Sequence, residues 1–337
     1  MARRAALVVR RLRNQPWLRR GVQLLIIVVP LAYVVYRLIV NWESLRDFQW
    51  HLDPWRLLGA LISLLLARMV SAIAGQRALS GLGYHMDSRS FLRGYFTSQL
   101  SIYLPGGLYV GRAIVFGGYG VDVISSSAAL MIELNAYILS GMLGSVPYLV
   151  LTGTAALPYP WLWGVILAPL LLSFLHPAIL GRVLRWLLAR AGYQDRQINL
   201  TVRQLITVLL LHVAYWLLAG AGFYLLVSSV HSVSSALFPV LVSAFCLAET
   251  ATMLLSVTPG GLGVLEGLLT LVLAPLLPAP LPALMAVLTR LWSTAALLIV
   301  ASSGALLGKS PQQAVVDEGP LLEDQGVGVE SPYNGRG

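Results

Sequence analysis

Charged side chains are scarce in this chain, and their scarcity excludes a soluble fold. Only 11% of the 337 residues are charged and 57% are hydrophobic, whereas soluble domains carry roughly 25% charged residues. The hydrophobic residues form long runs such as 24–40, 204–227 and 283–307. In a bilayer such runs must be helices, because a β-barrel would show short alternating segments instead. The sequence therefore predicts an all-α, polytopic integral membrane protein.

Cysteine and catalytic patterns are also lacking. Cys246 is the single cysteine and lies in an apolar segment, which excludes an intramolecular disulfide and a cysteine-based metal site. The histidines show no metal-ligand spacing, and His212 lies within an apolar run where a core histidine is expected. No Ser/His/Asp set, paired carboxylates, Walker loop or dinucleotide fingerprint occurs in a polar domain. We therefore expect no catalytic residues, no metal and no cofactor, and a protein that is not an enzyme.

Positive charge, in contrast, is concentrated in a few places. The net charge is +9, seven arginines lie within residues 3–20, and five more lie between Arg182 and Arg203. Because these clusters flank apolar runs, they indicate topology by the positive-inside rule, and nucleic acid is not an expected partner. Placing every Arg-rich segment on one side puts both termini in the cytoplasm. The predicted location is the cytoplasmic (inner) membrane of a prokaryote, as a multi-pass protein.

The chain is predicted to contain one transmembrane domain, residues 21–307, between a basic cytoplasmic leader (1–20) and a disordered cytoplasmic tail (308–337). Its first half (55–151) and second half (204–307) are linked by a cytoplasmic amphipathic segment (178–203). About six full spans are expected, at 21–40, 55–75, 124–151, 161–175, 204–228 and 283–307.

Two further apolar segments are interrupted. Residues 91–104 are too few for a span, which needs about 20 residues, and they end at Pro105-Gly106-Gly107 before a second short piece, 108–121. Residues 236–257 likewise meet Pro259-Gly260-Gly261 before residues 262–274. We interpret each segment as a re-entrant hairpin, which is tolerated at membrane depth when it is buried in protein or lines a cavity.

The two interruptions resemble each other. Pro105 to Arg112 reads Pro-Gly-Gly-Leu-Tyr-Val-Gly-Arg, and Pro259 to Glu266 reads Pro-Gly-Gly-Leu-Gly-Val-Leu-Glu. The first motif lies between an inward and an outward span and the second lies between an outward and an inward one, which predicts an inverted-topology repeat. Broken helices at matching positions of two halves indicate a transport site. Glycine permits the turn and a close approach, and the half-helix N-termini favour anionic groups.

Ionisable residues within the apolar segments are the remaining candidates, since each costs roughly 2.5–3.5 kcal/mol at the bilayer centre. Arg68 is interpreted equally well as a packing arginine. The predicted substrate-binding residues are Pro105, Gly106, Gly107, Arg112, Glu133, Glu249, Pro259, Gly260, Gly261, Glu266 and Arg290. Because Arg112 and Glu266 occupy matching positions, they are expected to meet near the midplane. Whether they form a substrate site or a structural ion pair stays open, as does a pair of Arg290 with Glu249.

These residues carry a family resemblance. Residues 91–142, with Leu104 to Gly107 followed by Arg112 and Glu133, resemble the transmembrane region of lysylphosphatidylglycerol synthetase. Residues 258–266, with Arg290 in the closing span, resemble it too, and the similarity extends over nearly all of 21–307. In the multiple peptide resistance factor proteins this region is flippase-like and moves aminoacylated phosphatidylglycerol between leaflets. Aminoacyl transfer belongs there to a separate cytosolic domain, which is not expected here.

The resemblance implies a flippase-like transporter of a phospholipid or lipid-linked substrate across the cytoplasmic membrane. Its partners would be membrane lipids with anionic or aminoacylated headgroups, and a homo-oligomer stays open. One alternative is an intramembrane enzyme acting on a lipid-linked phosphate or sugar, with Arg112 binding phosphate and Glu266 as acid or base. Another is a membrane scaffold for a partner enzyme.

Overall fold

The structure is a computed structural model that describes residues 52–103, 107–152, 182, 201–255 and 259–306, and within these ranges it contains helices and no strand. Several expectations lie outside the described residues. They are the leader, the spans at 21–40 and 161–175, nearly all of the amphipathic segment, and the tail.

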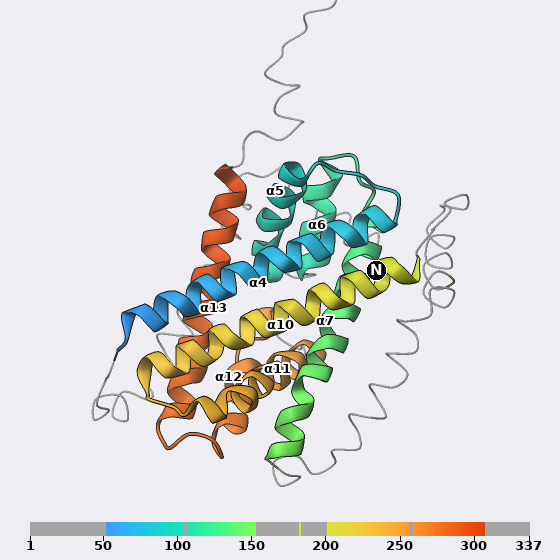
Figure 1. Cartoon of the computed structure of the whole chain (residues 1–337). Helices are drawn as coiled ribbons and strands as arrows, with labels where there is room; N and C mark the ends of the chain where they lie inside the picture. The colour runs from blue at the N-terminus through green and yellow to red at the C-terminus, as the bar shows by residue number, and fades with distance from the viewer. Residues whose placement is uncertain (1–51, 104–106, 153–181, 183–200, 256–258, 307–337) are drawn as a thin grey trace, which may run out of the picture.

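The main helices of the described residues form two successive sets of four, each in the order long, short, short, long, with the long end helices at 26–29 residues (Figure 1). The first set is α4 (Pro54–Gly81), α5 (Ser88–Gln99), α6 (Gly107–Gly117) and α7 (Val123–Leu151). The second set is α10 (Val202–Val230), α11 (Phe238–Leu254), α12 (Val264–Leu273) and α13 (Leu281–Leu306). Short 3₁₀ turns lie at η1 (Leu100–Tyr103), η3 (Ser235–Leu237) and η4 (Pro259–Gly261).

Four of these helices begin at a polar side chain that accepts hydrogen bonds from the backbone of the first turn. The caps are Asp53 for α4, Asp87 for α5, Asp122 for α7 and Thr201 for α10. Each cap satisfies N–H groups that a helix leaves unbonded. Thr201 also forms a capping box with Gln204, so α10 starts before residue 204. Arg203, which the sequence assigned to the amphipathic segment, therefore belongs to the first turn of α10.

The first long helices of the two sets, α4 and α10, pack side by side and antiparallel (Figure 1). At the start of α4, the Asp53 N–H donates to the Ser229 carbonyl near the end of α10 (2.8 Å), and Arg56 Nη1 donates to the Ser228 carbonyl (3.0 Å). Further along, Ser63 Oγ donates to the Leu218 carbonyl at 2.6 Å. These bonds fix the relative register of the two halves.

The other helices pack in a matching way in the two sets. The short helix α5 packs against α13 of the second set, and α11 packs against α7 of the first. In each set the second short helix contacts both its neighbours in the chain, α6 with α5 and α7, and α12 with α11 and α13. The turns η1 and η4 also touch, so a Cβ built at Gly260 would lie 2.4 Å from the Tyr103 ring. The places where the two apolar segments are interrupted therefore lie against each other.

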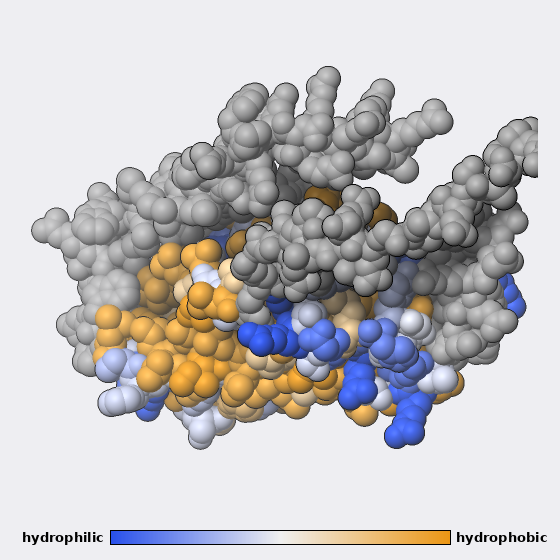
Figure 2. All heavy atoms as spheres, turned by 90° about the horizontal axis from the view of Figure 1, so that it is seen from above, coloured by the Kyte–Doolittle hydropathy of each residue, from blue (hydrophilic) through white to orange (hydrophobic). Residues whose placement is uncertain are grey.

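Five helices of the described part are long and apolar enough to cross a membrane, judged by length and composition. On α4 the exposed apolar residues recur every three or four positions and so form one stripe, the α4 stripe, which consists of Leu58, Ile62, Leu66, Met69 and Ile73. Figure 2 shows a broad hydrophobic area over the described residues on one face, with hydrophilic residues gathered at one end. This surface suits a lipid environment.

The helix bounds agree with most of the expected segments. The expected spans 55–75, 124–151, 204–228 and 283–307 correspond to α4, α7, α10 and α13. The segment Ser235–Leu254 is itself long enough to span, although the sequence assigned it to a hairpin arm. The number of spans and the re-entrant course of both segments stay predictions.

Candidate functional site

In the part of the chain that the structure describes, four charged side chains are buried, and they form two ion pairs. Arg112 and Glu133 are each 3% exposed, Glu266 is 1% exposed and Arg290 is 5% exposed. Each pair lies within one set of helices. Arg112 of α6 pairs with Glu133 of α7, and Arg290 of α13 pairs with Glu266 of α12.

The first pair is bidentate and lies under an aromatic ring. Both terminal nitrogens of Arg112 donate to Glu133, with Nη2 3.0 Å from Oε2 and Nη1 bonded to Oε1. The guanidinium carbon lies 4.2 Å from the centre of the Tyr95 ring. The Tyr95 hydroxyl donates to Glu133 Oε2 (3.3 Å) and is hydrogen-bonded to Ser71 Oγ (2.9 Å). Fork geometry and the ring together stabilise the buried cation.

A glycine on α4 makes room for this cluster. A Cβ built at Gly75 would lie 2.7 Å from the Tyr95 ring and 2.8 Å from Glu133 Oε1. Gly75, Tyr95 and Ser71 were not among the residues expected from the sequence. The available signal was a glycine inside an apolar helix, because glycine permits close packing. The sequence did not indicate which residues would pack against it.

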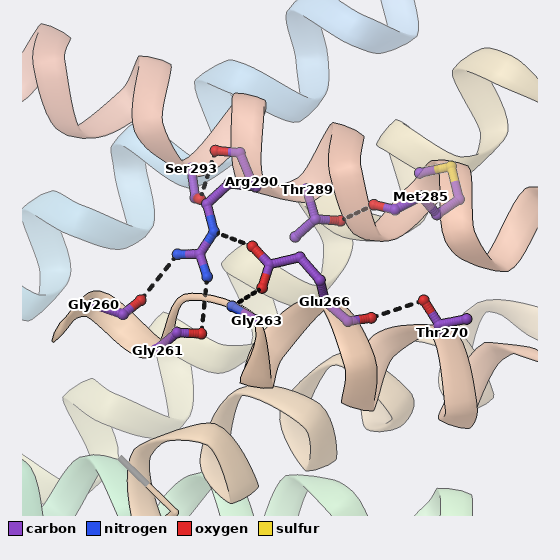
Figure 3. A network of polar contacts seen from close by, with 9 residues as sticks. All are labelled: Gly260, Gly261, Gly263, Glu266, Thr270, Met285, Thr289, Arg290 and Ser293. Carbon is purple, nitrogen blue, oxygen red and sulfur yellow. Dashed lines mark hydrogen bonds and ion pairs between the residues drawn. The ribbon is translucent and has the colours of Figure 1, made fainter. Parts of the chain in front are cut away.

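The second ion pair also forms hydrogen bonds with backbone groups of the Pro-Gly-Gly turn (Figure 3). Arg290 Nε donates to Glu266 Oε1 at 2.7 Å, while Nη1 donates to the Gly260 carbonyl (3.0 Å) and Nη2 donates to the Gly261 carbonyl (3.2 Å). The other oxygen, Glu266 Oε2, accepts the Gly263 N–H at 2.8 Å. Thus one arginine and one carboxylate tie the Pro-Gly-Gly turn to both α12 and α13.

The glycines of the two motifs differ in their surroundings. Gly260 and Gly261 both have φ of +65°, and a Cβ at Gly261 would lie 2.5 Å from the Thr252 side chain. Gly107 has φ of +52°, but a Cβ there would meet nothing within 4 Å. The close approach expected of these glycines therefore applies to the second motif, whereas Gly107 is needed only for its backbone conformation. Pro105 and Gly106 lie outside the described residues, and Pro259 begins η4.

The expected meeting of Arg112 with Glu266 across the two halves is wrong, and the pair of Arg290 with Glu249, which the sequence left open, does not form either. Each arginine instead binds the carboxylate of the helix that packs directly against its own, α6 on α7 and α12 on α13. Matching positions in a repeat place residues at equivalent depth but do not determine which side chains come into contact.

Two candidate charges remain outside these pairs. Arg68 of α4 and Glu249 of α11 form no hydrogen bond or ion pair with any residue that the structure describes. Within the same ranges, no group of three histidine, cysteine or acidic side chains could hold a metal ion. A cavity of about 280 Å³ lies elsewhere, at the turn from α4 to α5, beside Gln76, Arg77 and His85. It does not adjoin either ion pair.

Several long apolar helices around buried charge pairs define a multi-pass α-helical membrane protein. The family model described as "Lysylphosphatidylglycerol synthase TM region" matches residues 22–301. The chain belongs to this family, as its motifs had suggested. Among the proteins with curated descriptions, none matches the chain. Membership indicates a protein that works in the membrane in association with lipids.

Proposed function

We propose that the protein moves a phospholipid or lipid-linked substrate from one leaflet of the cytoplasmic membrane to the other without changing it chemically. The observation that carries this proposal is the contact between the two interrupted segments, where Gly260 packs against Tyr103. Each interruption is accompanied by a buried arginine–glutamate pair.

The arrangement of the helices supports a transporter. The two sets have the same order and matching packing partners, and their first helices are antiparallel. This is the arrangement expected of an inverted repeat, in which the substrate binds at the interface of the halves beside broken helices. In each half the helix after the break starts close to this interface, at Gly107 and at Val264. The N–H groups of a first helical turn favour an anionic headgroup.

The ion pairs supply the rigidity that such a site needs. Two opposite charges about 4 Å apart attract each other by roughly 4 kcal/mol at an effective dielectric of 20, before the cost of desolvation. In the second half this attraction holds a turn of three residues with positive φ, Gly260, Gly261 and Gly263. We assign substrate contact to the two Pro-Gly-Gly turns and to the charges beside them.

A leaflet-resolved lipid assay tests the proposal. The full chain is reconstituted in vesicles with a phospholipid labelled on its acyl chain, and the label in the outer leaflet is quenched from outside. We expect the protein to make the inner-leaflet label accessible, with the lipid mass unchanged. A changed lipid mass would favour the intramembrane enzyme. If the lipid neither moves nor changes its mass, the scaffold is the remaining alternative.

Two glycine variants provide a matched comparison in this assay. Gly261→Val places a side chain where Thr252 already lies, at a positive φ, and should abolish movement while leaving membrane insertion intact. Gly267→Ala lies one turn into α12, where a Cβ meets nothing within 4 Å, and should be fully active. Full activity of both variants would place the transport path elsewhere.

A further inference from the structure

Of the six ionisable residues that the sequence singled out, Arg68 and Glu249 form no ion pair in the described part, although the other four are paired. The Nε of Arg68 is buried without a hydrogen-bond partner, and within the described ranges no carboxylate forms an ion pair with its guanidinium. Glu249 of α11 likewise accepts no hydrogen bond there. A partly buried charge without a partner is unfavourable, so such groups in a membrane protein indicate a functional site.

Both side chains lie away from the outer surface of the protein. Arg68 lies midway along α4, about 120° around the helix from the middle of the α4 stripe at 3.6 residues per turn. On α11 every residue from Val240 to Ala248 is buried, so this helix is enclosed on all sides. Arg68 and Glu249 are nevertheless both partly accessible.

The surroundings of the two charges come from several helices. Arg68 of α4 and Glu249 of α11 lie within electrostatic range of each other and of Tyr137 (α7) and Tyr215 (α10). Glu249 also lies within electrostatic range of Arg290 of the second ion pair, whose effect on it is larger than that of Arg68. The centres of the two tyrosine rings are 5.5 Å apart. Beside Glu249, the buried hydroxyl of Thr250 has no hydrogen-bond partner among the described residues. Polar groups from both halves of the molecule therefore converge here with unused hydrogen-bonding capacity.

A cation and an anion that lie near each other without pairing suit a ligand that carries both charges. A guanidinium binds phosphate through its planar set of donors. A carboxylate flanked by aromatic rings binds an ammonium group, because the ring faces also attract cations. A headgroup with phosphate alone would leave Glu249 unpaired.

We propose that Arg68 and Glu249 form a binding site for a zwitterionic phospholipid headgroup, with the phosphate on Arg68 and the ammonium on Glu249. This inference rests on the transport function proposed above and assigns the headgroup to two charges that lie near the ion pairs but belong to neither. In this arrangement the pairs hold the turns along the transport path, and the unpaired charges add the contacts that select the headgroup.

The test compares two lipids that differ in the ammonium group. Phosphatidylethanolamine and phosphatidylglycerol, each labelled on the acyl chain, are assayed separately in vesicles that contain the full chain. The wild type should move phosphatidylethanolamine faster. Glu249→Gln should slow phosphatidylethanolamine at least tenfold without slowing phosphatidylglycerol, whereas Arg68→Gln should slow both. The control is Arg77→Gln, on an exposed arginine of the same helix, which should behave as the wild type.

Measurements of lipid binding and of thermal stability test the inference independently of lipid transport. Native mass spectrometry of the purified chain should show phosphatidylethanolamine retained by the wild type and lost from both variants. Neither variant should unfold at a lower temperature, because each removes a charge that has no partner. If lipid moves but its headgroup preference is the same in Glu249→Gln, the inference fails and the transport function stands. If the wild type moves no lipid, the transport function is contradicted. The binding site is then supported if the purified wild type retains phosphatidylethanolamine and both variants lose it, and is contradicted otherwise.

Discussion

The two halves of the molecule bury the same pair of charges in opposite order. In the first half the arginine follows the Pro-Gly-Gly turn and the carboxylate lies on the long helix, as Arg112 and Glu133. In the second half the carboxylate follows the turn and the arginine lies on the long helix, as Glu266 and Arg290. Equivalent positions in the two halves therefore carry opposite charges, while each half keeps one buried arginine–glutamate pair.

The two arginines also use their donors differently. Arg112 directs both terminal nitrogens to one carboxylate and stacks on Tyr95, so it joins one helix to another. Arg290 gives one nitrogen to Glu266 and two to the carbonyls of Gly260 and Gly261, so it also holds the turn. Within the described residues, the first turn has no equivalent arginine contact. The second turn should accordingly be the more rigid of the two.

The largest effect should come from breaking the first pair. Arg112→Gln leaves Glu133 charged and buried without its partner, which should lower the free energy of unfolding by about 3–5 kcal/mol. The double variant Arg112→Gln with Glu133→Gln should recover much of this loss. Thermal unfolding in detergent measures both.

A double-mutant cycle tests the same assignment against the pairing across the halves. Arg112 with Glu133 should show a coupling free energy of about 0.5–3 kcal/mol, whereas the effects of Arg112→Gln and Glu266→Gln should add. Strong coupling of Arg112 to Glu266, with none to Glu133, would contradict the observed pairs.

The next largest effect should distinguish Arg290 from Arg112 by the geometry of their hydrogen bonds. Arg290→Lys keeps the charge near Glu266 but loses the fork that reaches two carbonyls, and hydrogen bonds to charged groups contribute about 1.5–3 kcal/mol each. We expect faster amide exchange at residues 260–263 by hydrogen–deuterium exchange. Arg112→Lys is the matched control and should leave exchange at these amides unchanged. Equal acceleration in both variants would show that Arg290 does not hold the turn.

A smaller effect should distinguish the glycines of the two turns. Gly107→Ala and Gly260→Ala each place a side chain at positive φ, which costs about 1–2 kcal/mol. At Gly260 the new Cβ also meets Tyr103, so this variant should be the less stable of the two by thermal unfolding. Adding Tyr103→Ala should relieve Gly260→Ala and leave Gly107→Ala unaffected. The same melting temperature for both glycine variants would argue against the contact between the turns.

The sequence was sufficient for the elements but not for the contacts between them. Apolar runs located both ends of α7, α10 and α13 to within two residues, and the start of α4 to within one, although α4 continues to Gly81, beyond its expected end at residue 75. The cost of buried charge singled out all four paired residues. The partners could not be predicted, because contact depends on which helix faces which. For the same reason the sequence did not show that Tyr95 and Gly75 complete the first pair from neighbouring helices.

The smallest expected effect concerns the N-terminus of the first short helix in each half, since the two halves differ in how this helix is capped. Asp87 caps α5 by accepting the Ser90 N–H at 2.9 Å, whereas Leu237, the residue before α11, provides no side-chain cap. The bonds from Ser90 lower the pKa of Asp87 below its usual value of 3.8. Because the folded pKa is the lower one, the stabilisation is present above pH 3.8 and is lost as the pH falls through the folded pKa.

Asp87→Asn isolates this charge, since asparagine caps helices about as well as aspartate. The wild type should therefore exceed Asp87→Asn in stability by a constant, small amount from pH 7 down to about pH 4, and the difference should shrink below that. Asp87 is exposed, so solvent screening keeps the difference small. Asp87→Ala should lose about 0.5 kcal/mol or more at neutral pH through the missing cap. Thermal unfolding of the three proteins between about pH 3 and pH 7 measures both effects. A difference between wild type and Asp87→Asn that grows as the pH falls would contradict the lowered pKa, and with it the view that α5 has a charged cap where α11 has none.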